Sequence, residues 1–242
     1  PHIAYRQEGV WHAQLLDGAW DARLVSEDIN FNVLDLAVGP DGQSHLVWVG
    51  SSYEENERSW PLYYAQSEGH DWAVETMNWY QPGNPPSLGL DAAGVPHVVY
   101  SHDWVYHGIP SAGQWVTETV VEGTALGMDF DSADHLHVLY RVRLEDLFRI
   151  QTIYQDGSTW RAGSGVLHVG LLVESPNAMA VDARGDTHIL LYSGWEQGDL
   201  LYARWQGDAW LVDRIEAIGG MFLPGWYDLA VRRNGIFGDS EN

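Results

Sequence analysis

The 242-residue sequence contains no cysteine, and it has no long apolar run. Without cysteine the chain forms no disulfides and offers no thiolate ligands to a metal. The longest apolar stretch, residues 166–173, is interrupted by His168 and Gly170 and is far too short to cross a bilayer. We therefore expect a soluble protein with no membrane insertion.

Positive charge is scarce as well, and lysine is missing altogether. The 12 basic residues are all arginine and face 34 Asp and Glu, so the formal net charge is −22 at pH 7. Such a chain repels phosphate backbones and anionic lipid, which makes nucleic acid and membrane surfaces poor partners. The sequence starts inside a repeat at Pro1, so any signal peptide would already be absent. We expect an extracellular or cell-surface protein.

What the chain has in abundance is internal repetition. Each of five units ends with a tryptophan that follows a turn, and each contains a histidine that opens an apolar strand. The tryptophans are Trp20, Trp72, Trp115, Trp160 and Trp210, and the histidines are His2, His45, His97, His137 and His188. Repetition at roughly 45 residues is typical of propellers and related arrays.

One unit shows how the repeat folds. Residues 177–219 contain four short apolar runs, at 178–182, 188–192, 200–205 and 210–215, separated by turns that include Gly185 and Gly207. This spacing predicts a four-stranded antiparallel meander. A sheet of this kind cannot bury both faces alone, so five of them should pack face to face around an axis. The sequence predicts an all-β, five-bladed β-propeller.

The two ends of the chain predict how the ring closes. Residues 226–235 match the first strand of a blade and then stop, whereas residues 1–33 match the outer three strands. Together they would form one blade, which removes the exposed sheet edges. The other blades are expected at residues 34–86, 87–124, 125–176 and 177–225. We therefore interpret residues 1–242 as one monomeric domain.

The repeat motifs carry a family resemblance. Their pattern is an apolar strand, Asp-x-x-Gly, a histidine, a second strand, Tyr-Ala and Gly-x-Trp, and residues 154–160 read YQDGSTW. This pattern resembles the Asp-box (BNR-type) repeats of bacterial sialidase-like propellers. Sialidases of this type look six-bladed and use an arginine triad, which this chain does not offer. Five-bladed glycosidases and five-bladed lectins are the other relatives that the blade count suggests.

Candidate ligand-binding residues lie in the loops that vary between repeats, because variable loops on a rigid scaffold are the usual place for binding. Aromatic rings beside carboxylates and guanidinium groups suit sugars, which stack their C–H faces and share their hydroxyls in hydrogen bonds. The alternative is that the loop tryptophans cover blade edges. The candidates are Arg6, Tyr53, Arg58, Trp60, Trp79, Trp104, Arg141, Trp195, Trp226 and Tyr227.

Two inner-strand carboxylates are candidates for catalysis. Asp35 and Asp228 occupy a position that the other repeats fill with Ser87, Ala125 and Ala178. If the ring closes as predicted, the pair lies near the mouth of the central channel, where it could act as acid and base or bind Ca²⁺. The structural alternative is that each carboxylate accepts backbone N–H groups.

Among the histidines only His102, next to Asp103, looks placed for proton transfer. The five repeated histidines are predicted to bond to the adjacent turn, so we predict no metal-ligand set and no cofactor other than a possible Ca²⁺. The favoured function is a carbohydrate-binding, lectin-like propeller whose partner is a glycan. A glycoside hydrolase or polysaccharide lyase is the first alternative. A protein-interaction scaffold is the second, because fold alone does not set function.

Overall fold

The computed structural model describes residues 1–28, 33–50, 52–54, 57–79, 85–170, 173–193 and 197–219. All regular elements in these ranges are β-strands, as predicted for an all-β protein. No helix in the described ranges is long and apolar enough to span a membrane. The chain forms two compact units, Pro1–Ala125 and Leu126–Asn242, which are taken in turn.

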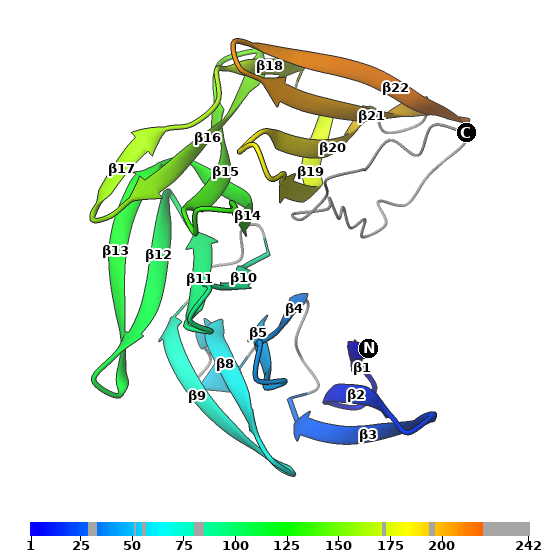
Figure 1. The fold of residues 1–242 in the computed structure, drawn as a ribbon, viewed down its shortest axis with the longest axis vertical. Helices are drawn as coiled ribbons and strands as arrows, with labels where there is room; N and C mark the ends of the chain where they lie inside the picture. Colours follow the sequence, from blue (N-terminus) through cyan, green and yellow to red (C-terminus); the bar gives the residue numbers. More distant parts are fainter. Residues whose placement is uncertain are drawn as a thin grey trace, which may run out of the picture. The chain divides into compact units, whose positions relative to one another are not determined.

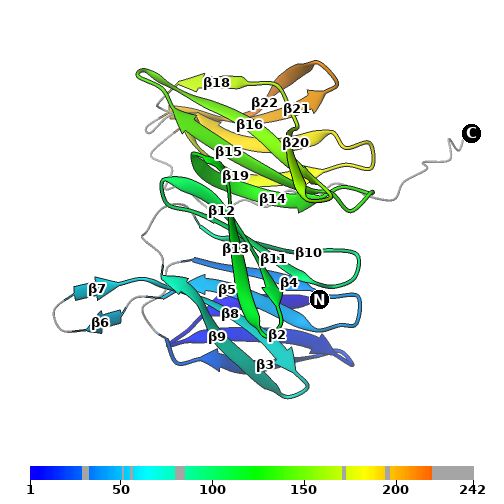
Figure 2. The same cartoon turned by 90° about the vertical axis from the view of Figure 1, so that its left-hand side faces the viewer.

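The first unit contains three antiparallel sheets (Figure 1). The first sheet consists of β1 (His2–Arg6), β2 (Val10–Leu16) and β3 (Ala19–Ser26). The second consists of β4 (Val33–Val38), β5 (Ser44–Val49), β8 (Pro61–Glu68) and β9 (Asp71–Trp79). The third consists of β10 (Ser87–Leu90), β11 (Pro96–Ser101), β12 (Trp104–Ser111) and β13 (Gln114–Glu122). A separate hairpin, β6 (Ser52–Glu54) and β7 (Glu57–Ser59), projects beside the second sheet (Figure 2).

Two further antiparallel sheets make up the described part of the second unit. The fourth sheet begins at the boundary with β14 (Thr124–Phe130) and continues with β15 (Leu136–Arg143), β16 (Leu147–Asp156), β17 (Thr159–Ala162) and β18 (Leu167–Gly170). The fifth consists of β19 (Val173–Val181), β20 (Thr187–Ser193), β21 (Gln197–Gln206) and β22 (Ala209–Gly219). The four strands predicted for residues 177–219 are therefore confirmed. The strand predicted at 226–235 lies outside the described residues.

The fourth sheet departs from the predicted four strands because its outer strand is broken. β17 pairs with residues 153–156 of β16, and β18 pairs with residues 147–150. Between them the backbone N–H of Thr152 donates to Ser164 Oγ at 2.9 Å, and that of Ser164 donates to Thr152 Oγ1 at 2.7 Å. A Cβ at Gly163 would collide with Thr152, and one at Gly165 would collide with the ring of Trp205. Only glycine therefore fits at these two positions between β17 and β18.

Three of the repeated histidines lie beside their turns, and one of them, His137, hydrogen-bonds to its turn as predicted. Nε2 of His97, His137 and His188 lies 3.7, 3.1 and 3.4 Å from the carboxylate of the first residue of the preceding turn, which is Asp91, Asp131 or Asp182. The same aspartates cap their turns. Burial opposes the charge on Asp131 and Asp182, yet hydrogen bonds from turn N–H groups and from histidine hold the pKa of both below the usual value.

The hydrophobic cores lie between consecutive sheets. All six residues of β5 are buried, and its alternate side chains enter two different cores. Leu46 and Trp48 pack with Val10 of the first sheet, whereas Val47 and Val49 pack with Val98 of the third. In the second unit, β15 and β16 pack against β19 and β20 through a cluster that includes Leu139 and Ile189. The packing of neighbouring sheets thus supplies the core.

Two aspartates tie the inner strands of successive sheets together. Asp35 Oδ2 in β4 accepts the N–H of Leu88 in β10 at 2.8 Å, while Oδ1 accepts that of Leu36. In the second unit, Asp129 Oδ2 in β14 accepts the N–H of Val181 in β19 at 2.8 Å. Hydrogen bonds to charged groups contribute roughly 1.5–3 kcal/mol each.

Asp129 stands at a different strand position from Asp35, so comparing the repeats at that one position could not find it; the register in this repeat was also wrong by two residues. The turn bond from the Asp131 N–H to the His135 carbonyl matches the bond from Asp182 to Asp186 in the fifth sheet. Counting back from this turn places Gly127, not Ala125, at the position equivalent to Ala178.

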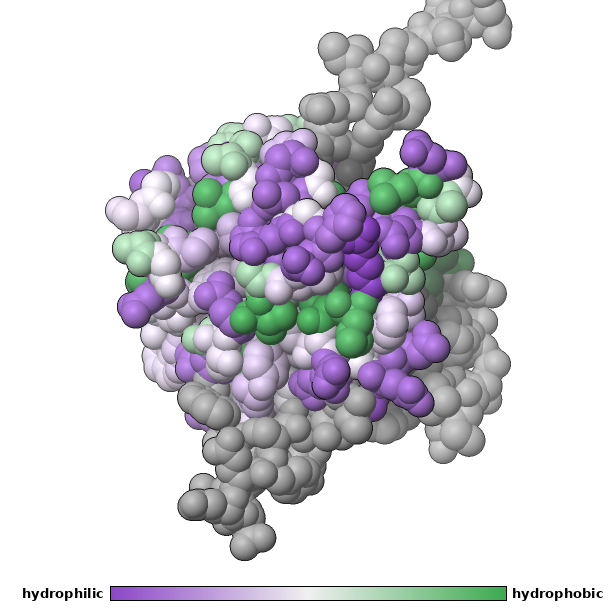
Figure 3. All heavy atoms as spheres, turned by 90° about the horizontal axis from the view of Figure 1, so that it is seen from below, coloured by the Kyte–Doolittle hydropathy of each residue, from purple (hydrophilic) through white to green (hydrophobic). Residues whose placement is uncertain are grey.

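Apolar side chains on the outer strands of the first two sheets are scattered. Trp20, Leu24 and Val74 are 40–50% exposed. Figure 3, which looks from below the view of Figure 1, shows hydrophobic residues in small groups among hydrophilic ones. Isolated exposed apolar residues are common on protein surfaces, so we assign them no role.

We expect Asp129→Ala to lower the free energy of unfolding by about 2 kcal/mol, because it leaves the Val181 N–H without its carboxylate. Urea denaturation followed by circular dichroism measures the change. The control is Asp213→Ala, which alters an exposed aspartate of β22. Equal urea midpoints for the two variants would contradict a bridging role for Asp129.

Candidate functional site

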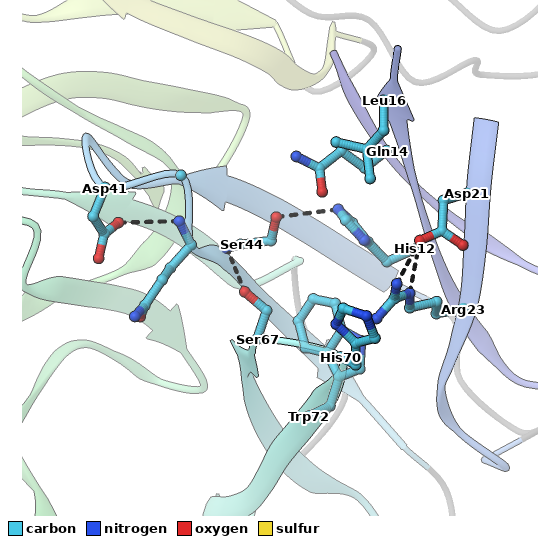
Figure 4. Close-up of a pocket in the computed structure, with 13 residues that line it drawn as sticks. His12, Gln14, Leu16, Asp21, Arg23, Asp41, Ser44, Ser67, His70 and Trp72 are labelled. Atoms are coloured by element: carbon cyan, nitrogen blue, oxygen red, sulfur yellow. Dashed lines mark hydrogen bonds and ion pairs between the residues drawn. The ribbon is translucent and has the colours of Figure 1, made fainter. Parts of the chain in front are cut away.

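A pocket of about 230 Å³ opens between the first and second sheets of the first unit (Figure 4). β2 and β3 form one wall. The other wall comes from β5, β8, β9 and the tight turns β4–β5 and β8–β9. Its lining residues are His12, Gln14, Leu16, Asp21, Arg23, Asp41, Gly42, Gln43, Ser44, Ser67, Gly69, His70 and Trp72.

An ion pair on β3 supplies the charged part of the pocket. Nε and Nη2 of Arg23 donate to the same oxygen, Oδ2 of Asp21, at 2.9 and 2.6 Å. The side chains are 29% and 40% exposed, respectively. This arrangement leaves Arg23 Nη1 and Asp21 Oδ1 without a hydrogen bond to any described residue. Both residues line the pocket, so Arg23 keeps a spare donor there and Asp21 a spare acceptor.

Ser44 and two histidines form the buried back of the pocket. Ser44 Oγ lies 3.0 Å from His2 Nδ1 and 3.1 Å from His12 Nε2, and the two ring nitrogens are 3.1 Å apart. A protonated ring nitrogen cannot accept a hydrogen bond, so the three atoms bond to one another best when both rings are neutral. Burial, followed by the nearby charges of His2 and Arg23, lowers the pKa of His12 to about 4.

The hairpin between β8 and β9 contributes the aromatic part. Trp72 packs edge to face against His12, with ring centroids 5.2 Å apart, and is partly buried. His70 precedes it in the turn, which Gly69 permits by adopting a φ of +64°. Figure 4 shows both side chains on the side of the pocket opposite Asp41. The walls of the pocket thus combine an indole ring, the Arg23–Asp21 ion pair, the imidazole of His70 and glutamine amides.

Different side chains meet at the equivalent place between the second and third sheets. Strand register makes Trp115 equivalent to Trp72. Trp115 packs edge to face on Tyr64 at 4.9 Å, and its Nε1 donates to Glu75 Oε1 at 2.8 Å. Glu75 stands three residues after its landmark tryptophan, the place that Arg23 occupies in the first sheet.

Further differences separate the two interfaces. Ala73 stands where the first sheet has Asp21, and the third sheet has prolines where the second has serines. Pro96 replaces Ser44, and Pro110 replaces Ser67. The polar groups of the pocket are thus specific to the first of these two interfaces.

The pocket lies at the end of the strands where the tight turns are, whereas the sequence analysis placed ligand binding on the variable loops. None of the predicted site residues lines it. Trp60 packs against the core between the second and third sheets, and Trp104 is 43% exposed at the start of β12. Arg6 ends β1. The Arg141 guanidinium lies 4.5 Å from the centre of the Phe148 ring, and burial lowers its pKa.

The remaining predicted residues also lie away from this pocket or beyond description. Tyr53, Arg58 and Trp79 belong to β6, β7 and β9, with side chains that are not described. His102 pairs with Asp103 at 3.0 Å on the surface, and Asp35 forms the bridge described above. Trp195, Trp226, Tyr227 and Asp228 lie outside the described residues. Within the described ranges no group of three or more His, Asp or Glu side chains could hold a metal ion.

One sequence signal pointed to the pocket. Arg23 stands where three other repeats have the acids Glu75, Glu118 and Asp213, and His12 and His70 lie outside the series of landmark histidines. Of the histidines outside that series, the sequence analysis selected His102 instead.

Comparison with known proteins shows similarity of fold only. AofleA from Arthrobotrys oligospora superposes with a TM-score of 0.55 at 11% identity, over 91% of this chain and 70% of that chain. A polysaccharide lyase, PL25 ulvan lyase, gives a TM-score of 0.51 at 13% identity, over 89% and 68%. Its structure bound to -[GlcA(1-4)Rha3S]- gives 0.50 at 13% identity, over 87% and 67%.

A fucose lectin from Kordia zhangzhouensis gives a TM-score of 0.38 at 16% identity, over 55% of this chain and 99% of that chain. No protein-family model matches the sequence, so the Asp-box resemblance finds no support there. No curated protein matches the sequence either.

We expect the stability of the fold to decrease below pH 6.5. The pKa of His12 falls from 6.5 to about 4, and burial likewise lowers the pKa of His2, His45, His107 and His137. Because these folded-state values lie below the unfolded value, the unfolded chain binds more protons in this range. The stabilisation is complete above pH 6.5 and is lost as the pH falls, by up to about 1.4 kcal/mol per pH unit for each histidine.

Urea denaturation at pH 8, 6 and 5 measures this dependence. His12→Gln should make the loss between pH 6.5 and 4 shallower, whereas His168→Gln, at an exposed position, serves as control. A wild-type stability that does not change between pH 8 and 5 would contradict the prediction.

Proposed function

We propose that this protein binds carbohydrate and that the pocket between its first and second sheets is the binding site. The observation that carries the proposal is the contrast between two equivalent interfaces. In one, Trp115 packs on Tyr64 and bonds to Glu75, and in the other a pocket is lined by polar groups. A repeat that departs from its own pattern at one interface does so at the expense of packing, which points to a function there.

The chemistry of the walls suits a sugar. The C–H face of a pyranose packs on an aromatic ring, and Trp72 supplies a partly buried indole. Each hydroxyl both donates and accepts hydrogen bonds, and the pocket lining offers a spare donor on Arg23 and a spare acceptor on Asp21. Gln14 and His70 add neutral polar groups.

The similarity of fold to a polysaccharide lyase supports a saccharide as the ligand class. We propose binding without turnover, because hydrolysis of a glycosidic bond needs two carboxylates in acid and base roles. In the pocket Asp21 is held by Arg23, and Asp41 accepts the Gln43 N–H at 3.0 Å. On the inner strands Asp35 and Asp129 bridge to neighbouring sheets. These carboxylates therefore already have structural partners.

For the fold we propose that the five sheets are blades of one propeller. Each sheet of this kind must cover both faces, and the first sheet has three described strands, where the repeat predicts four. Residues 226–235 would supply the missing inner strand, as the sequence pattern suggests.

Arg23→Ala should abolish saccharide binding, because it removes the donor and releases Asp21. We expect at least a tenfold loss of affinity in titration calorimetry against the best saccharide from a glycan array. The matched control is Arg161→Ala, which breaks a similar exposed ion pair, Arg161–Asp156 at 2.8 Å, in the second unit. Equal affinities of the Arg23→Ala and Arg161→Ala variants would refute the pocket as the site.

Deletion of residues 226–242 should lower the melting temperature strongly, because it removes the proposed inner strand of the first sheet. Deletion of residues 236–242 alone should leave the melting temperature within about 1 °C, since the repeat pattern ends at residue 235. Calorimetry measures the melting temperatures of the two truncated proteins. Equal values would argue against ring closure by residues 226–235.

A further inference from the structure

The charge distribution in the pocket says which class of saccharide fits. Its lining includes two carboxylates, Asp21 and Asp41, and one guanidinium, Arg23. Arg23 does not present an unpaired positive charge, because two of its nitrogens bond to Asp21 at 2.6 and 2.9 Å. The formal balance of these three groups is one negative charge, within a chain of net charge −22.

An anionic sugar would meet two penalties here. Its carboxylate or sulfate could accept from Arg23 Nη1, but Asp21 already balances the charge of the guanidinium, so this bond lacks the gain that an unpaired cation would give. It would also approach Asp41 and the negative field of the whole chain. A neutral hydroxyl meets neither penalty, since it can donate to Asp21 and accept from Arg23 without breaking the ion pair.

The size of the pocket limits how much of a glycan can enter. Pockets for drug-sized ligands usually span roughly 300–1,000 Å³. The volume of about 230 Å³ is smaller and suits a single sugar ring. A longer chain would place one ring in the pocket, with the rest in solvent.

We propose that the pocket takes one neutral sugar ring, free or at the end of a glycan, and rejects uronates and sulfated sugars. The inference rests on the proposed carbohydrate-binding function and narrows it. The proposed ligand differs in charge from that of the ulvan lyase of similar fold, which was solved bound to -[GlcA(1-4)Rha3S]-.

Paired probes test the inference directly. Methyl glucoside, galactoside and mannoside are each compared with the methyl uronide of the same configuration, which differs only at C6. Calorimetry or ligand-observed NMR at low salt gives the anions their best chance, because screening is then weakest. We expect the best neutral glycoside to bind at least tenfold more tightly than its uronide, with an affinity that salt leaves unchanged.

A charge variant supplies an internal check. Asp21→Asn removes one negative charge and releases Arg23, so the gap between glycoside and uronide should narrow several-fold. Asp156→Asn makes the same change in the ion pair of the second unit and should leave the gap intact.

The remaining outcomes separate the two claims. Uronides that bind as tightly as glycosides, with binding lost in Arg23→Ala, would overturn the selectivity and leave carbohydrate binding in place. An absence of binding by all probes and by a glycan array would overturn both. Binding that Arg23→Ala leaves unchanged would place the sugar outside this pocket and overturn the inference.

Discussion

The packing of sheets against one another within each unit is the constraint on which this structure depends. A sheet of three or four short strands has two faces and cannot cover either of them alone. β5 shows the consequence most clearly, because Leu46 and Val47 are neighbours in sequence yet belong to two different cores. The landmark tryptophans and the aspartate bridges at Asp35 and Asp129 serve the same contacts between sheets. Few of the repeated residues are left over for function.

Function in such a molecule has to come from departures from the repeat. When every unit keeps an aromatic residue, a histidine and a turn for packing, a binding site can form where one interface gives up part of its closure. The interface between the first two sheets departs from the repeat in this way. Arg23 stands where three other repeats have an acid, and Ser44 and Ser67 stand where the third sheet has prolines. The hydrogen bonds among Ser44, His2 and His12 keep the opened interface from leaving buried polar groups unpaired.

The sequence predicted the sheets well but did not predict the pocket, for the same physical reason. Strand periodicity and glycine turns are local, so the strands of residues 177–219 and the bond of His137 to its turn could be predicted from the repeat. The pocket is made by side chains from two repeats that are far apart in sequence, such as Arg23 and Trp72, and the register between sheets decides whether they meet. Predicting it required a residue-by-residue alignment of the units. Ala125 was misaligned by two residues, and the bridging carboxylate Asp129 lies two residues beyond the correctly aligned Gly127.

The acidic composition and the proposed ligand are consistent with each other. A chain with net charge −22 and no lysine has little means of attracting anions over long distances. Recognition of a neutral ring depends instead on contacts within the pocket, where an ion pair that remains intact fixes the directions of a donor and an acceptor. Because Arg23 and Asp21 hold each other in place before the ligand arrives, little side-chain freedom is lost on binding. The same pairing that makes the pocket unattractive to an anion makes it a preformed site for hydroxyl groups.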